Sequence, residues 1–279
     1  DVGLAIAGGK GRVSRKTPEQ VKQLGEKLGL RDRWIEKLVY ASKMSAKVDN
    51  AALQDSYTLY HHCIFFDEKG NWAVVQQGMN GKTSYARRYH WNSCQLSDFI
   101  EEPHSAICCD EKKELVLNIP SKESGENRKA SLDLVKESPR KIEAHLKALA
   151  EQKTLFNWHI QVKEKHLMMP RNINWQALRE AYEFQPKNYE EFLSIKGIGP
   201  NTVRALALIS ELIYGSKADW RDPVKYSFAV GGKDGVPFPV KRRAMDKATE
   251  VLSDAVKQAK LSNYEKLQAI KRLKQLVPD

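Results

Sequence analysis

The spacing of apolar residues divides the chain into helical ends and a strand-rich middle. Val21, Leu24 and Leu28 recur at helical spacing, and a capping box at Thr17 predicts where that helix begins. From residue 57 the pattern changes to apolar runs typical of buried strands, joined by a turn at 67–71. Helical spacing then returns in the second half. The expected strands are 57–66, 72–77, 105–109 and 115–119, and later helices are expected from about 139, 174, 188, 200, 241 and 262.

These elements predict an α+β fold. We expect a mixed α/β N-terminal domain with a central β-hairpin sheet at residues 1–153, followed by an all-α domain at 154–279. A length of 279 residues is enough for about two domains. The segments 8–12 and 120–129, rich in glycine and charge, read as loops, and a short helix is expected at 51–54.

The clearest local motif is a glycine turn between two helices. Asn188 and Glu191 form a capping-box-like start, Gly197 and Gly199 allow a tight turn at positive φ, and Pro200 suits the first position of the next helix. The free amides of such a turn and the dipole of the helix behind it favour a bound phosphate. The residues expected to contact nucleic acid here are Lys196, Gly197, Ile198, Gly199, Asn201, Thr202 and Arg204.

This motif resembles the helix-hairpin-helix of DNA repair proteins, which grips backbone phosphates without reading bases. The resemblance implies a monovalent cation held by hairpin carbonyls. A hairpin that only packs, or that contacts protein, is the alternative.

The charge of the chain points to the same kind of partner. The formal net charge is +11 and the pI is about 9.3, which suits a polyanion. The excess lies at the ends, because residues 1–50 hold 11 basic and 6 acidic side chains and residues 191–279 hold 16 and 10. Lys10 and Arg12 are further expected contacts. We therefore expect a nucleic-acid partner, DNA rather than RNA.

Cysteine usage and hydropathy suggest a location. The four cysteines show no paired C-x-x-C spacing, so neither a disulfide framework nor structural zinc is expected. The sequence has no apolar run of about 18 residues and no signal-peptide pattern, so we expect no membrane partner and a cytoplasmic protein.

A cluster of polar residues in the strand region is the expected place for chemistry. Four of the seven histidines lie between residues 61 and 104, near arginines and carboxylates. Such a set could hold a divalent metal, or a histidine could move protons beside an arginine that stabilises a phosphorane. A buried hydrogen-bond network is the alternative. The expected catalytic residues are His61, His62, Gln77, Arg88, His90 and His104.

Several of these segments together are similar to one family. The strings at 60–62, 66–80, 85–91, 102–104 and 227–235, with the glycine turn, resemble the domain-of-unknown-function 763 family over nearly the whole chain. The family pattern has histidine where this chain has Val230. The resemblance also implies a further N-terminal segment of the same protein, which would be an additional partner. It implies no particular activity.

Three classes of function follow. The first is a nuclease of DNA repair or processing, in which the hairpin holds the backbone and the histidine and arginine residues act on the phosphodiester. The second is a helix-hairpin-helix DNA glycosylase with Asp222 as its catalytic carboxylate. It would be monofunctional, because Asn201 stands where glycosylases with lyase activity carry lysine. The third is a non-catalytic DNA- or RNA-binding protein.

Overall fold

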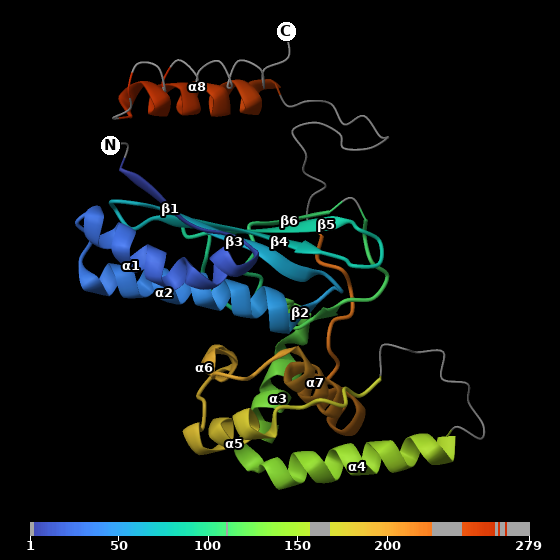
Figure 1. Cartoon of the computed structure of the whole chain (residues 1–279). Helices are drawn as coiled ribbons and strands as arrows, with labels where there is room; N and C mark the ends of the chain where they lie inside the picture. The colour runs from blue at the N-terminus through green and yellow to red at the C-terminus, as the bar shows by residue number, and fades with distance from the viewer. Residues whose placement is uncertain are drawn as a thin grey trace.

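A computed structural model describes residues 3–109, 111–156, 168–224, 242–259, 262 and 266 (Figure 1). Its largest sheet is antiparallel, with the strand order β1-β3-β4-β5-β6. The first strand of the chain therefore lies at one edge, beside β3, and the others follow in sequence order. The strands are β1 (Leu4–Lys10), β3 (Thr58–Asp67), β4 (Trp72–Met79), β5 (Ala86–Asn92) and β6 (Ala106–Cys109).

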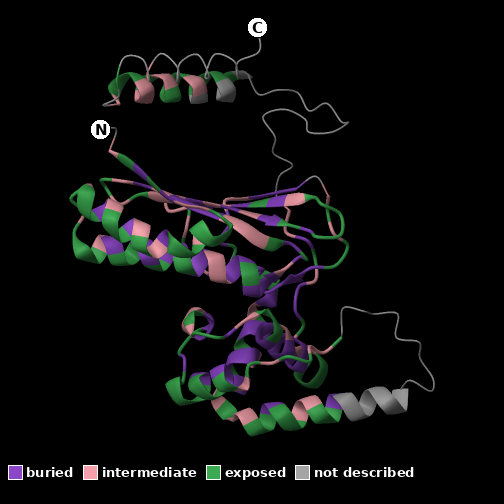
Figure 2. Ribbon diagram, viewed as in Figure 1, coloured by how far each residue is buried: buried purple, intermediate pink, exposed green. Residues whose placement is uncertain are grey.

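Two helices cover one face of this sheet. They are α1 (Thr17–Lys27) and α2 (Asp32–Lys47), preceded by the 3-10 helix η1 (Gly11–Lys16) and followed by the π-helix η2 (Val48–Ala52). Leu38 of α2 is buried, as are Ile64, Val74 and Trp91 of the strands. Figure 2 shows buried residues along both α2 and the strands of the sheet. We call the covered side of the sheet the inner face and the opposite side the outer face.

A helical group lies beyond α2, linked to it by the short sheet of β2 (Leu53–Gln54) and β7 (Leu117–Asn118). One continuous apolar cluster runs from Ala5 to Ala218 and includes both parts. The helix α3 is central and packs against the four other helices of the group. The group consists of α3 (Gly125–Glu137), α4 (Pro139–Phe156), α5 (Trp175–Phe184), α6 (Tyr189–Ser194) and α7 (Pro200–Tyr214). The short 3-10 helix η3 (Lys122–Ser124) precedes α3, and a further helix, α8, spans Arg242–Gln258.

Many expected elements are confirmed. The Asn174 side chain caps α5 and the Asn188 side chain caps α6. Thr17 begins α1, but its hydroxyl donates to the Ser14 carbonyl at 2.7 Å and does not form the expected capping box. Gly215 ends α7 with φ of 71°. The overall class is mixed α/β, as expected. The helix α3 precedes the expected domain boundary at 153 and α4 crosses it, yet both pack with α5 and α7.

Other expectations are wrong. The segment 8–12 is not a loop, because Gly8 ends up in β1, where a Cβ would lie 2.1 Å from the His62 carbonyl oxygen. The short helix expected at 51–54 is half right, because residues 51 and 52 end the helical η2, whereas 53 and 54 form β2. The segment 120–129 is not a loop, because it contains η3 and the start of α3. The strand β5 was not expected. The string 227–235 and most of the helix expected from 262 lie outside the described residues.

Candidate active site

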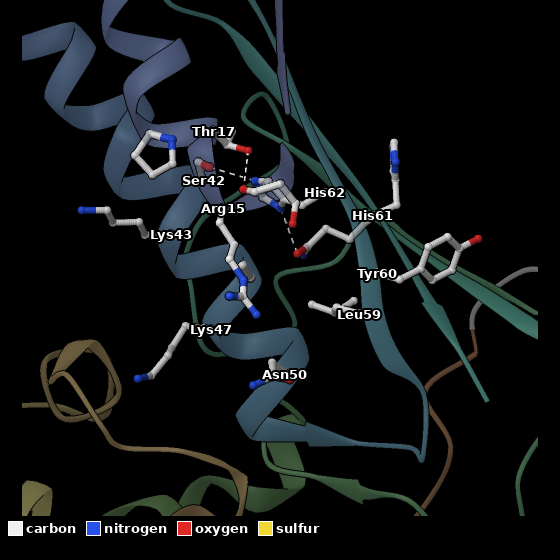
Figure 3. Close-up of a pocket in the computed structure, with 14 residues that line it drawn as sticks. Arg15, Thr17, Ser42, Lys43, Lys47, Asn50, Leu59, Tyr60, His61 and His62 are labelled. Carbon is white, nitrogen blue, oxygen red and sulfur yellow. Dashed lines mark hydrogen bonds between the residues drawn. The ribbon is translucent and has the colours of Figure 1, made fainter. Parts of the chain in front are cut away.

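A cavity of about 390 Å³ opens between η1, α2 and the strands β3 and β4. Figure 3 shows Arg15 extending into the space between α2 and β3, with Ser42 and His62 at one end. Arg15, Lys43 and Lys47 give the lining three cationic side chains. An anionic ligand is the kind of molecule that such a lining would attract.

A chain of hydrogen bonds leads from this cavity into the core. Ser42 Oγ lies 2.8 Å from His62 Nε2, and His62 Nδ1 lies 3.0 Å from Gln76 Oε1. Gln76 Nε2 then donates to Asp49 Oδ2. All four residues are buried, and the first three also line the cavity. We call these four residues the Ser42–Asp49 relay.

The hydrogen bonds determine where the protons lie. The Asp49 carboxylate only accepts, so Gln76 presents its Nε2 to Asp49 and its Oε1 to His62. Since Oε1 also only accepts, His62 Nδ1 carries the ring hydrogen. Burial lowers the pKa of His62 and keeps the ring neutral at pH 7. The lone pair of Nε2 therefore faces Ser42, and the Ser42 hydroxyl donates to it.

Local structure places each member of the relay. Ser42 lies within α2, and strand pairing sets Gln76 of β4 directly opposite His62 of β3. Asp49 lies in η2, a π-helical turn of the kind that often occurs at functional sites. It also accepts from Trp91 Nε1 at 3.0 Å and contacts His104 Nε2. The relay therefore branches at Asp49 and reaches a second predicted histidine.

The other predicted catalytic residues lie on the outer face. Side chains alternate along a strand, so His61 points away from its neighbour His62, as Figure 3 shows. The register aligns His61 with Gln77 and Gln77 with Arg88. His90 shares this face, where burial and then the charge of Arg88 lower its pKa. The four histidines expected in one cluster are therefore divided between two faces.

The predicted glycine turn joins α6 to α7 and adjoins the cavity. Lys47, which lines the cavity, donates from Nζ to the Ile195 carbonyl at 3.1 Å. Gln54 donates to the Pro200 carbonyl at 2.8 Å, and Asn174 to the Gly197 carbonyl at 3.2 Å. These carbonyls, the expected ligands of a monovalent cation, thus already accept from protein donors. We refer to residues 195–200 as the hairpin.

The two glycines of the hairpin differ in conformation. Gly197 has φ of 88°, as expected, and a Cβ there would lie 2.7 Å from Asn174 Nδ2. Gly199 has φ of −127°, which any residue can adopt, so the expected positive φ at this position is wrong. Within the described part of the chain, neither glycine amide has a protein acceptor.

The remaining predicted nucleic-acid contacts differ in exposure. Lys196 and Asn201 are exposed, but Ile198 and Thr202 are buried, so their side chains serve packing. Arg204 is half-buried, and its guanidinium lies 5.3 Å from the centre of the Trp220 ring. Lys10 lies opposite His61 in the sheet, and Arg12 is exposed in η1.

Asp222, the alternative catalytic carboxylate, is buried in an ion pair. Arg87 donates to both of its oxygens, at 3.0 and 2.7 Å. The backbone amides of Lys113 and Val224 add one hydrogen bond to each oxygen. A carboxylate that accepts four hydrogen bonds has little capacity left to activate water. Its position is that of a structural group, which weakens the glycosylase alternative.

Sequence reasoning missed Ser42 and Asp49. A serine inside an amphipathic helix and an aspartate after it are common, and neither has a motif around it. The alternation of side chains along the strands could have pointed to them, because it places His62 and Gln76 on the buried face. Buried polar groups require hydrogen-bond partners, and Ser42 and Asp49 are those partners.

The described residues contain no group of three or more His, Cys, Asp or Glu side chains arranged to hold a metal ion. Among these residues, no helix has the length and apolar character needed to cross a membrane.

The fold and the site define a mixed α/β protein with a buried serine-histidine pair at a basic cavity. A family model described as "Protein of unknown function (DUF763)" matches residues 1–240, and the chain belongs to this family. None of the curated proteins and none of the solved structures matches this chain.

Proposed function

We propose that this protein binds DNA and acts on its phosphodiester backbone, as a repair or processing nuclease of the cytoplasm. The observation that carries the proposal is the continuity of the hairpin with the cationic cavity. Lys47 belongs to both, because its side chain lines the cavity and its ammonium contacts the Ile195 carbonyl. A backbone held at the hairpin would therefore continue past Lys47 toward His62.

The hairpin offers the features that a phosphate requires, and we interpret it as a helix-hairpin-helix. Its carbonyls accept hydrogen bonds from Lys47, Gln54 and Asn174. The amides of Gly197 and Gly199, without a protein acceptor among the described residues, precede the 15-residue helix α7, whose dipole favours an anion. Lys196, exposed beside them, adds charge.

Gly199 provides the sharpest test of DNA binding. A valine there suits the extended backbone, and the nearest atom to its Cβ is 3.9 Å away, so the variant should fold. The side chain would nevertheless block the approach of a phosphate. We expect Gly199→Val to weaken duplex affinity about tenfold or more in a fluorescence anisotropy titration, a loss of about 1.4 kcal/mol. The affinity should also fall steeply with salt, since basic contacts release counterions.

Gly81→Val is the matched control. It makes the same substitution at an exposed glycine whose Cβ would meet nothing within 4 Å. Its affinity should equal that of the parent protein. A folded Gly199→Val protein that also binds like the parent would contradict the proposal and assign the hairpin to packing or to a protein partner.

Cleavage assays separate the three classes of function. The substrates are single-stranded, duplex, branched and base-damaged DNA, each with and without divalent metal. Backbone cleavage that is lost in His62→Ala supports a nuclease. Release of a base with an intact backbone would favour the glycosylase, and binding without reaction would favour a non-catalytic protein.

A further inference from the structure

Ser42 occupies the position of an activated nucleophile. It lies at the cavity end of the relay, and its hydroxyl is 2.8 Å from the lone pair of His62 Nε2. Gln76 holds the opposite ring nitrogen at 3.0 Å and is itself held by Asp49. A nucleophile bound to a base, with the base oriented by a third group, is the arrangement that covalent catalysis requires.

A purely structural role explains this arrangement less well. Burying a serine, a histidine, a glutamine and an aspartate in one apolar layer carries a desolvation cost that a packed apolar core would avoid. The nearby Ser45 shows the simpler solution, because its hydroxyl donates to the Ser42 carbonyl of its own helix. Ser42 instead directs its hydroxyl to a strand, at the wall of a cavity.

We propose that Ser42 is a catalytic nucleophile that forms a covalent phosphoserine ester with a phosphodiester substrate. The choice of a diester as substrate rests on the proposed function, whereas the assignment of the nucleophile does not. Arg15 extends into the same cavity and would offset the charge that develops on the phosphoryl oxygens (Figure 3). Lys43 and Lys47, whose side chains extend away from Ser42, add positive charge to the lining.

The reaction balances with water as the only other reactant. Ser42 Oγ attacks phosphorus and transfers its proton to His62 Nε2, and the bond from phosphorus to the leaving oxygen breaks as that oxygen takes the proton from Nε2. Water then attacks the phosphoserine and gives a proton to Nε2. The bond from phosphorus to Oγ breaks, and Oγ recovers its proton from His62.

A small dialkyl fluorophosphate tests the nucleophile in the full chain. Its phosphorus–fluorine bond breaks when a serine attacks, so one dialkylphosphoryl group should add per chain, located at Ser42 by peptide mass spectrometry. His62→Ala should slow labelling about 10²- to 10⁴-fold, since it removes the base. Ser42→Ala should abolish both the label and the hydrolysis of bis(p-nitrophenyl) phosphate.

Ser45→Ala is the matched control, because it removes a hydroxyl that is equally buried in the same helix and does not line the cavity. It should be labelled at the rate of the parent. Absence of an adduct at Ser42, a label on another residue, or diester hydrolysis unchanged in Ser42→Ala would overturn the proposal. If Ser42 is labelled but Gly199→Val leaves the DNA affinity unchanged, the proposal of DNA binding is overturned and the assignment of the nucleophile stands.

Discussion

The two faces of the five-stranded sheet carry similar residue types in different situations. The inner face holds His62 and Gln76, joined to Ser42 and Asp49 by hydrogen bonds. The outer face holds His61 and Gln77, the immediate neighbours in sequence, which the register sets opposite each other. Both histidines line the cavity beside the helices, but His62 has an oriented partner at each ring nitrogen, whereas His61 Nδ1 is buried without a partner among the described residues. Residue type alone therefore does not identify a site.

The same contrast separates the adjacent arginines of β5. Arg87 is fully buried and forms ion pairs with Asp55 and Asp222, at 3.0 and 2.7 Å. Arg88 is exposed on the outer face. One arginine is held between strands and loop by two carboxylates, and the other is available to solvent.

The largest expected effect is on catalysis. His62→Ala should reduce diester hydrolysis about 10²- to 10⁴-fold, because it removes the proton acceptor of Ser42. His90→Ala, the outer-face counterpart, should change the rate less than about threefold. Initial rates with bis(p-nitrophenyl) phosphate measure both. The opposite ranking would move the chemistry to the outer face.

The next effect is on stability. Arg87→Met should lower the free energy of unfolding by about 3–5 kcal/mol, since it leaves two buried carboxylates without their cation. Arg88→Met should stay within about 0.5 kcal/mol of the parent. Urea unfolding at pH 7 gives both values. A loss below about 1 kcal/mol in Arg87→Met would show that this pair contributes little.

A smaller effect concerns acid. The pKa of His62 is lowered by burial, and an unfolded histidine titrates at about 6.5. Below that pH the unfolded chain binds more protons than the folded one, so stability is lost as the pH falls. Replacing His62 with glutamine should make the decrease between pH 7 and 5 smaller by up to about 2 kcal/mol. His90, whose pKa is also lowered, should contribute with the same sign. An unchanged pH profile in His62→Gln would mean that the pKa of His62 is the same in the folded and unfolded states.

Local patterns predicted the elements that rest on local chemistry. Thr17 begins α1 as expected, but its hydroxyl donates to the Ser14 carbonyl, so the expected capping box is wrong. The capping residues Asn174 and Asn188 and the αL stop at Gly215 define helix ends within a few residues of sequence. They were confirmed for this reason. The turn at 67–71 is also local, because the Asp67 carboxylate accepts from the amides of Lys69 and Asn71.

The missed elements depend on distant partners. In α3, the buried Asn127 donates to the Ala207 and Ser216 carbonyls, and the buried Arg128 to the Ile119 carbonyl. Polar residues at core positions interrupt the apolar period, so the sequence read as a loop. The relay has the same origin, because α2, η2, β3 and β4 each supply one residue. The histidines were found as residue types, but their division between faces needed the strand register.

The contact between Lys47 and the Ile195 carbonyl couples two events that would otherwise be independent. A ligand in the cavity that recruits the Lys47 ammonium would release the carbonyl, and a ligand that reshapes the hairpin would release the ammonium. Thermodynamic reciprocity then requires each ligand to change the affinity for the other by the same factor. Burial lowers the pKa of Lys47, so its ammonium has already lost part of its hydration shell and would need less energy to change partners. Lys47 would thus link the two sites, so that a ligand bound in the cavity changes the affinity of the hairpin for its own ligand.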